Sequence, residues 1–184
     1  PLRRVLGVIR PTAEVIGHIT HNNHVGILAT EGTIRSHSYD IEIHKFFPEV
    51  KVTGLACPMW VPLVENGQAS HPTADRHVSE RIEALLTLDP DIDTILLGCT
   101  HYPLLLPKIR QHTPQGITVM TQGQYIADSL DDYLHRHPNI DRQLTRGAAT
   151  RYLTSELPER FHQHASLFLN TPIDPQHITQ IRLP

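Results

Sequence analysis

The chain has 184 residues, and its 16 lysines and arginines against 19 aspartates and glutamates give a formal net charge of −3. A chain of this length can bury a real core, and the nearly balanced charge argues against nucleic acid or an anionic membrane as a partner. No apolar stretch is long enough to cross a bilayer, and two cysteines are too few for a disulfide scaffold. We therefore expect a cytoplasmic protein with free thiols that acts on a small soluble ligand.

Short apolar runs alternate with helical patterns along most of the chain. The apolar runs predict five strands, over residues 5–9, 25–29, 50–55, 93–97 and 117–120. The helical patterns predict helices over residues 13–19, 34–46, 75–88, 103–112 and 125–135. This alternation is typical of an α/β fold with a parallel sheet and right-handed crossovers.

Other segments depart from the alternation. Trp60 to Gly67 predicts a loop because Pro62 interrupts it, and the polar residues 138–150 predict a mobile loop. Residues 151–154 predict a last strand, residues 157–169 a helix, and residues 178–183 an edge strand.

Polar and nucleophilic side chains follow the ends of several predicted strands. They are Thr30, Thr33, Cys57, Glu65, Cys99, Thr100 and His101. In open parallel sheets, ligands bind outside the carboxyl ends of the strands. We therefore expect these side chains to converge on one crevice.

Cys99 is the strongest candidate for chemistry. It lies between a buried strand and a helix start, where backbone N–H groups and the helix dipole favour the thiolate, and His101 can strengthen that effect. His101 can also orient a nucleophile or donate a proton near neutral pH. The alternatives are a packing role for Cys99, as for most free cysteines, and a helix-capping role for His101.

The remaining candidates have comparable structural alternatives. Partial burial would raise the pKa of Glu65 and let it act together with a neighbouring imidazole, although most such glutamates are solvated loop residues. Thr30 and Thr33 suit a carboxylate ligand at a helix start, and ordinary capping explains them nearly as well. Cys57 has no base within a few residues, so we expect it to pack in the core.

The sequence offers no metal or nucleotide signature. His18, His21 and His24 are spaced by threes, which spreads them round a helix that Asn22 and Asn23 would break. No glycine-rich phosphate-binding motif is present. We expect neither a metal ion nor a nucleotide cofactor.

Four segments together resemble bacterial glutamate racemases, members of the cofactor-independent aspartate/glutamate racemase superfamily. The most specific is LLGCTHYPLL at Leu96–Leu105, and the others are LGVIRP at Leu6–Pro11, ATEGTI at Ala29–Ile34 and ACPMWVPLVENG at Ala56–Gly67. The resemblance spans nearly the whole chain and fades after about Asp141.

The resemblance implies a role for each candidate side chain. Cys99 would be the second of two catalytic cysteines, with Glu65 supporting His101 and Thr100 and His101 contacting the substrate or assisting Cys99. Thr30 and Thr33 would help to hold the substrate carboxylate. In such enzymes a thiolate removes the α-proton of the amino acid and an opposed thiol reprotonates the other face, which provides D-glutamate for peptidoglycan.

The resemblance also implies two flavodoxin-like lobes with the site between them. We expect residues 1–22 to be a remnant of the first lobe, residues 23–111 to form the second lobe with Cys99, and residues 112–184 to return to the first lobe and end in a tail. The family's Cys-Asn-Thr segment and its Asp-Ser-Gly loop are absent from this chain. The sequence therefore predicts an amino-terminally truncated racemase that is impaired on its own. It is also compatible with a homodimer.

Two other interpretations stay open at this point. A related enzyme with a single thiol, such as an arylmalonate-type decarboxylase, needs only one proton donor. An inactive carboxylate-binding module would keep the same polar side chains without turnover.

Overall fold

The computed structural model describes residues 5–147 and 150–182. The chain divides into two compact units, Pro1–Arg136 and His137–Pro184, and each is described by itself below.

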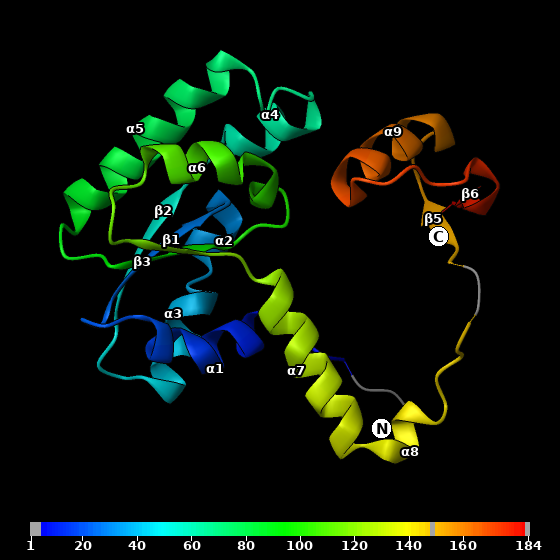
Figure 1. Cartoon of the computed structure of the whole chain (residues 1–184), viewed down its shortest axis with the longest axis horizontal. Coiled ribbons are helices and arrows are strands. Elements are labelled where there is room, and N and C mark those ends of the chain that lie inside the picture. Colours follow the sequence, from blue (N-terminus) through cyan, green and yellow to red (C-terminus); the bar gives the residue numbers. More distant parts are fainter. Residues whose placement is uncertain (1–4, 148–149, 183–184) are drawn as a thin grey trace. The chain divides into compact units, whose positions relative to one another are not determined.

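A four-stranded parallel sheet forms the centre of the first unit. Its strands are β1 (His24–Ala29), β2 (Lys51–Ala56), β3 (Thr94–Leu97) and β4 (Thr118–Met120). They lie in the order β2-β1-β3-β4, so that β1 and β3 are central (Figure 1). The α/β class and the parallel sheet are therefore confirmed.

The central strand β1 is buried on both faces, which explains its unbroken apolar run. Val25, Ile27 and Ala29 belong to the core that packs against α1 and α3. On the other face, a Cβ at Gly26 would lie 2.7 Å from Leu85 of α5. Glycine at this position therefore allows α5 to pack closely on the sheet.

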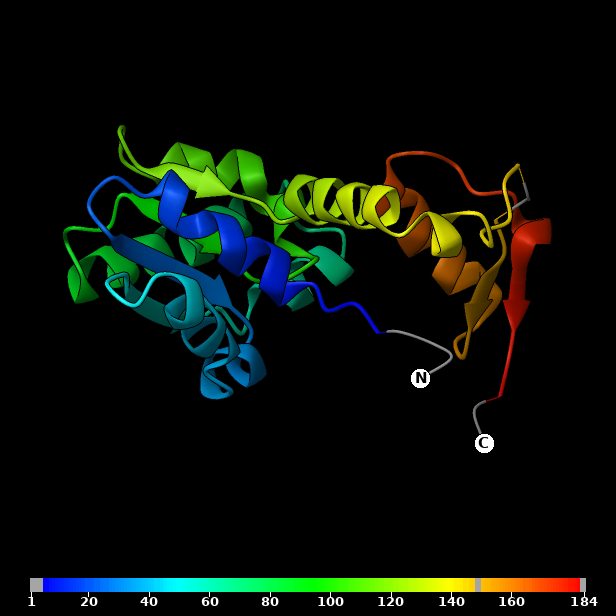
Figure 2. The same cartoon turned by 90° about the horizontal axis from the view of Figure 1, so that it is seen from below.

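Helices cover both faces of the sheet. Figure 1 shows α5 (Pro72–Leu88) and α6 (Leu106–His112) on one side, and α1 (Ile9–Ile19) and α3 (Ser38–Phe46) on the other. Figure 2, seen from the second side, shows α1 in front of the sheet. The helix α7 (Gly123–Arg136) packs against α1.

Two predicted elements, the strand over residues 5–9 and the loop after Trp60, were wrong. Residues 5–7 form no strand, Val5 is 97% exposed, and α1 begins at Ile9. The predicted loop after Trp60 is instead the helix α4 (Trp60–Glu65). Pro11 and Pro62 each occupy the third position of these helices, where a backbone N–H has no intrahelical partner to lose.

The predicted helix over residues 34–46 is two helices. The short helix α2 (Glu31–Arg35) ends before His37, which has a left-handed backbone with φ of 52°, and α3 follows. This turn redirects the chain onto the face of the sheet that α1 also covers.

The second unit contains a two-stranded parallel sheet and one longer helix. Its elements are α8 (Pro138–Asp141), β5 (Tyr152–Thr154), α9 (Pro158–Leu169), a 3₁₀ turn at Pro175–His177 and β6 (Ile178–Gln180). The helix α8 replaces the start of the predicted loop over residues 138–150. Residues 148–149 of that loop and residue 183 of the predicted edge strand lie outside the described residues.

The sheet of the first unit extends beyond the predicted end of the second lobe. The strand β4 pairs with β3, with Thr118 opposite Thr94, although that lobe was expected to end at Gln111. The division into lobes at residues 22 and 111 stays a prediction, and residues 1–4 of its first part lie outside the described residues. Within residues 5–147 and 150–182, no helix is long and apolar enough to cross a membrane.

Candidate active site

The candidate side chains gather where the two central strands end. From β1 the chain crosses to β2 on one side, and β3 lies on the other side of β1, as in flavodoxin-like sheets. Leu28 pairs with Leu97, and the Gly98 N–H donates to the Leu28 carbonyl at 2.8 Å. This pairing places the segments after Ala29 and after Leu97 side by side at the usual ligand-binding edge.

Cys99, His101 and Glu65 form a continuous polar chain. The Cys99 Sγ lies 3.8 Å from the His101 Nδ1, and the His101 Nε2 lies 2.5 Å from the Glu65 Oε1. The side chains of His101 and Glu65 are 22% and 36% exposed, so small molecules can approach them. The expected proximity of these three residues is therefore present.

The Glu65 carboxylate selects the tautomer of His101. A carboxylate only accepts hydrogen bonds, so the His101 Nε2 must carry the proton that it donates to Glu65. In neutral His101 the Nδ1 then presents its lone pair to the Cys99 thiol. The imidazole can accept the thiol proton, and Glu65 would stabilise the imidazolium that results.

The resting state of Cys99 differs from the sequence-based expectation. Partial burial raises the pKa of the Cys99 thiol above its ordinary value, while the backbone N–H groups of His101 and Tyr102 oppose that rise. We expected the thiolate to be favoured, and the net direction is the opposite. Cys99 is therefore a thiol at neutral pH. It must pass its proton to a base before it can itself act as a base.

Aromatic packing holds the His101 and Glu65 segments together. The Trp60 ring in α4 meets the Tyr102 ring edge-on, with centroids 4.8 Å apart, and both side chains are fully buried. The Trp60 indole N–H donates to the His77 carbonyl, and the Tyr102 hydroxyl donates to the Cys57 carbonyl. Because Glu65 ends α4 and His101 precedes Tyr102, the contact between the Trp60 and Tyr102 rings sets the spacing between Glu65 and His101.

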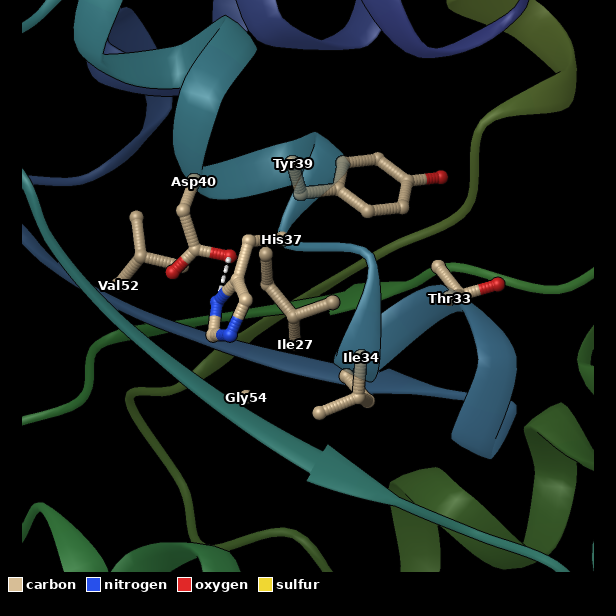
Figure 3. Close-up of a pocket in the computed structure, with 8 residues that line it drawn as sticks. All are labelled: Ile27, Thr33, Ile34, His37, Tyr39, Asp40, Val52 and Gly54. Carbon is tan, nitrogen blue, oxygen red and sulfur yellow. Dashed lines mark ion pairs between the residues drawn. The ribbon is translucent and has the colours of Figure 1, made fainter.

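The two threonines cap α2 at the end of β1. The Thr30 Oγ1 accepts from the Thr33 N–H at 3.4 Å, and the two hydroxyl oxygens lie 3.0 Å apart. Thr33 also lines a cavity of about 170 Å³ beneath α2 and α3, shown in Figure 3. Thr100 follows Cys99 and is exposed. Capping is therefore confirmed for Thr30, and substrate binding by these hydroxyls stays a prediction.

Cys57 is a core residue, as expected. Its side chain is 1% exposed, and its thiol donates weakly to the Leu55 carbonyl at 3.8 Å. Burial raises the pKa of Cys57 to about 12. Both cysteines are free, and Cys99 is the accessible one.

The one group of metal-type ligands found in the described residues lies at the opposite end of the sheet, where β1 and β2 begin. It consists of His24, Asp89 and Asp91. The buried Asp89 carboxylate already pairs with the Lys51 ammonium at 3.2 Å and with His24 at 3.0 Å. This cluster therefore serves as an ion pair that ties strand starts to the end of α5, apart from the Cys99 site.

Two residues beside the site were missed at the sequence level. Gln122 lies just before α7 and donates to the Leu97 carbonyl at 3.0 Å, and Tyr39 of α3 donates to Gln122 at 2.8 Å. The two residues are separated by 83 positions, so no local pattern could have shown the contact.

Comparison with known proteins identifies the family of the chain. The sequence model described as Asp/Glu/Hydantoin racemase matches residues 5–129. A glutamate racemase of Shouchella clausii is 38% identical over 92% of this chain and 60% of its own length. A glutamate racemase of Lactiplantibacillus plantarum is 35% identical over 95% of this chain and 63% of its own length.

Solved structures agree with the sequence relatives. A glutamate racemase of Bacillus anthracis superposes with a TM-score of 0.86 and 29% identity, covering 98% of this chain and 65% of that protein. A Francisella tularensis glutamate racemase in complex with D-glutamate gives 0.79 and 26%, covering 95% of this chain and 62% of that protein. The chain therefore spans less than two thirds of the length of these relatives. By the match over residues 5–129, it belongs to the Asp/Glu/Hydantoin racemase family.

Proposed function

We propose that this chain carries one proton-transferring half of a glutamate racemase site, with Cys99 as its acid/base thiol. The observation that carries the proposal is the chain from the Cys99 Sγ through His101 to Glu65, at 3.8 Å and 2.5 Å. The names of the relatives support glutamate as the substrate, since the Francisella structure holds D-glutamate and an Escherichia coli glutamate racemase structure holds L-glutamate. The reaction needs no cofactor in this scheme, because both proton carriers are side chains.

Each polar side chain has a stated role in the proposal. His101 accepts the Cys99 thiol proton, and the thiolate then removes the α-proton of glutamate, which leaves a carbanion and regenerates the thiol. Glu65 stabilises the imidazolium while it exists. Thr30 and Thr33 hold the substrate carboxylate through their hydroxyl groups, and Thr100 and His101 contact the substrate or assist Cys99.

Inversion needs an acid on the opposite face of the carbanion. Of the two cysteines, Cys57 is buried in the core with a pKa raised to about 12, so it does not serve that face. We therefore propose that this chain exchanges the α-proton of one enantiomer and inverts it slowly. We also propose that the protein acts in the cytoplasm, where it supplies D-glutamate for peptidoglycan. A homodimer is one assembly to test.

The test is deuterium exchange at the α-carbon. The chain is incubated with L-glutamate and, separately, with D-glutamate in deuterated water, and the α-proton signal is followed by NMR together with chiral analysis. We expect exchange of one enantiomer with little inversion. Cys99→Ser should abolish exchange, while Cys57→Ser, the matched control, should keep it.

The alternatives predict other outcomes of the same experiment. Rapid full inversion would overturn the half-site proposal, because one thiol cannot serve both faces. Heat of glutamate binding without exchange would indicate a carboxylate-binding module. Decarboxylation of an arylmalonate without glutamate exchange would indicate the single-thiol enzyme, which the burial of Cys57 also favours.

A further inference from the structure

Gln122 joins three elements directly behind the Cys99 segment. Its Nε2 donates to the Leu97 carbonyl of β3 at 3.0 Å. Its Oε1 accepts from the Tyr39 hydroxyl of α3 at 2.8 Å and from the Thr12 hydroxyl of α1 at 3.2 Å. One side chain therefore connects the end of β3 to both helices on this face of the sheet.

The partners of Gln122 determine which way its amide faces. The Leu97 carbonyl can only accept, so the amide nitrogen must point toward it. The amide oxygen then faces Tyr39 and Thr12, and both hydroxyls must donate. Because Thr12 and Tyr39 are buried, replacing Gln122 by an apolar residue would leave buried polar groups without a partner.

The clamp formed by Gln122, Tyr39 and Leu97 lies close to the reactive thiol. A Cβ at Gly98 would lie 3.1 Å from the Tyr39 Cε2 and 3.0 Å from the Ala29 Cβ, so the chain leaves β3 in tight contact with the Tyr39 ring. Figure 3 shows the Tyr39 hydroxyl pointing away from His37 and Asp40, on the side opposite their ion pair. Burial, opposed by the bond to Gln122, raises the pKa of Tyr39 to about 12. Tyr39 therefore stays a neutral donor in the clamp.

We propose that Gln122 is a positioning residue for Cys99: by holding the Leu97 carbonyl and the Tyr39 hydroxyl, it fixes the direction in which the Cys99 segment leaves the sheet. The segment so placed aims the backbone N–H groups of His101 and Tyr102 at the Cys99 sulfur. This inference rests on the proposed role of Cys99, although the test below reads the thiol itself and needs no turnover.

A glutamine suits this position and a glutamate does not. An ionised carboxylate at residue 122 would face the Leu97 carbonyl, which is also negative and lies two residues before Cys99. A protonated carboxyl would reproduce all three hydrogen bonds of Gln122. The titratable groups around the clamp are Tyr39 from α3, Tyr125 from α7, and Cys99 and His101 after β3, with Glu65 bonded to His101.

The test uses the whole chain with Cys57→Ser, so that Cys99 is the only thiol. Gln122→Glu is compared with Gln124→Glu, a matched control because Gln124 is exposed on α7, two residues away, where it bonds Asp128. The rate of alkylation by iodoacetamide is measured from pH 6 to 10, and the melting temperature is recorded at each pH to show that the chain stays folded.

The expected signature is the ratio of variant rate to parent rate. Because the Leu97 carbonyl in front of residue 122 favours a neutral carboxyl, the carboxyl of Gln122→Glu should still be protonated at pH 6, and the ratio should be near one there. The ratio should fall about tenfold by pH 9, because the carboxylate that forms disfavours the thiolate by about one pKa unit. For Gln124→Glu it should stay within about twofold at every pH. A flat ratio for Gln122→Glu, whether at one or below one, would overturn the proposal, since a purely structural role has no such pH dependence.

A second variant keeps the inference testable if the ionised carboxylate of Gln122→Glu unfolds the chain. Gln122→Met keeps the length of the side chain but removes its hydrogen bonds. It should slow alkylation at pH 8 by about threefold or more, because the N–H groups of His101 and Tyr102 no longer converge on the sulfur. An unchanged or faster rate would overturn the proposal. Absence of glutamate exchange together with these alkylation results would contradict the proposed function and leave the role of Gln122 intact.

Discussion

The two cysteines of the chain follow β2 and β3, the strands on either side of β1 in one sheet, and have opposite properties. Cys57 follows β2 directly, and its backbone continues the sheet pairing through a hydrogen bond from its N–H to the Ala29 carbonyl at 2.9 Å. Cys99 follows β3 after a glycine, and its side chain lies beside His101. Burial and the nearest base, rather than position after a strand, therefore decide which thiol can react.

Selective alkylation should show the largest difference between the two thiols. With a pKa near 12, roughly one Cys57 in 10⁵ is ionised at pH 7, and its side chain is 1% exposed. Iodoacetamide followed by peptide mass spectrometry should therefore label Cys99 at least about a thousandfold faster than Cys57 in the native chain.

The pH dependence of labelling has a definite sign. Because partial burial raises the pKa of Cys99, its labelling rate should keep rising with pH and reach half of its maximum above the ordinary value for a thiol. Unfolding the chain in denaturant should bring the two rates together, as a control. Comparable labelling of both thiols in the native chain would contradict the assignment of Cys57 to the core.

Removing the charge from Glu65 should reduce the difference between the thiols. Glu65→Gln leaves the His101 tautomer unfixed and no longer stabilises the imidazolium, so fewer Cys99 thiols pass their proton to His101. Because a hydrogen bond to a charged group is worth about 1.5–3 kcal/mol, we expect Cys99 labelling at pH 8 to slow by about 10- to 100-fold.

The control for Glu65→Gln is Glu83→Gln, at an exposed position of α5. Cys99 labelling in this variant should match that of the parent chain. A Glu65→Gln rate within about twofold of the parent would show that the short contact between Glu65 and His101 does not tune the thiol.

The sequence predicted the four strands of the main sheet well, but it predicted the helix starts poorly and placed a strand over residues 5–9 where none forms. Apolar runs such as Thr94–Leu97 are buried on both faces, and few other structures bury so many consecutive apolar residues. Pro62 was interpreted as interrupting a loop, although it lies in the first turn of α4, just as Pro11 lies in the first turn of α1. The interpretation of Glu65 as a loop residue followed from the same error.

The site was predictable where its residues are close in sequence or belong to the segments that resemble racemases, as Glu65 does, and not where only the fold brings them together. Cys99 and His101 are two positions apart, and their types and order indicated the chemistry. Gln122 contacts Tyr39 and Thr12 across separations of 83 and 110 positions, which only the packing of α1, α3 and β3 produces. The raised pKa of Cys99 likewise depends on how deeply the fold buries it, which spacing does not show.

Gly98, which precedes Cys99, lets the chain turn away from the sheet in close contact with its neighbours. Ala56, which precedes Cys57, lies where the chain continues the sheet pairing. In Gly98→Ala the new methyl group would lie 3.0 Å from the Ala29 Cβ and 3.1 Å from the Tyr39 ring. Such overpacking costs about 1–3 kcal/mol, so the free energy of unfolding in urea should fall by that amount. Ala56→Gly, at the matching position before Cys57, should cost only about 0.5–1 kcal/mol. Equal losses in the two variants would mean that the tight contact at Gly98 relaxes without cost.

Tyr102 connects the two strand ends and should give the smallest effect. Its backbone N–H donates to the Cys99 carbonyl at 3.3 Å, and its hydroxyl donates to the Cys57 carbonyl at 3.2 Å. Tyr102→Phe keeps the ring that packs on Trp60 but removes the donor to a buried carbonyl, so the free energy of unfolding should fall by about 1 kcal/mol. Labelling of Cys99 should not change, because the backbone bond remains, while Cys57 should label slightly faster through local opening. A large change in the labelling rate of Cys99 with no change at Cys57 would show that the Tyr102 hydroxyl acts on the strand end at Cys99 instead of the one at Cys57.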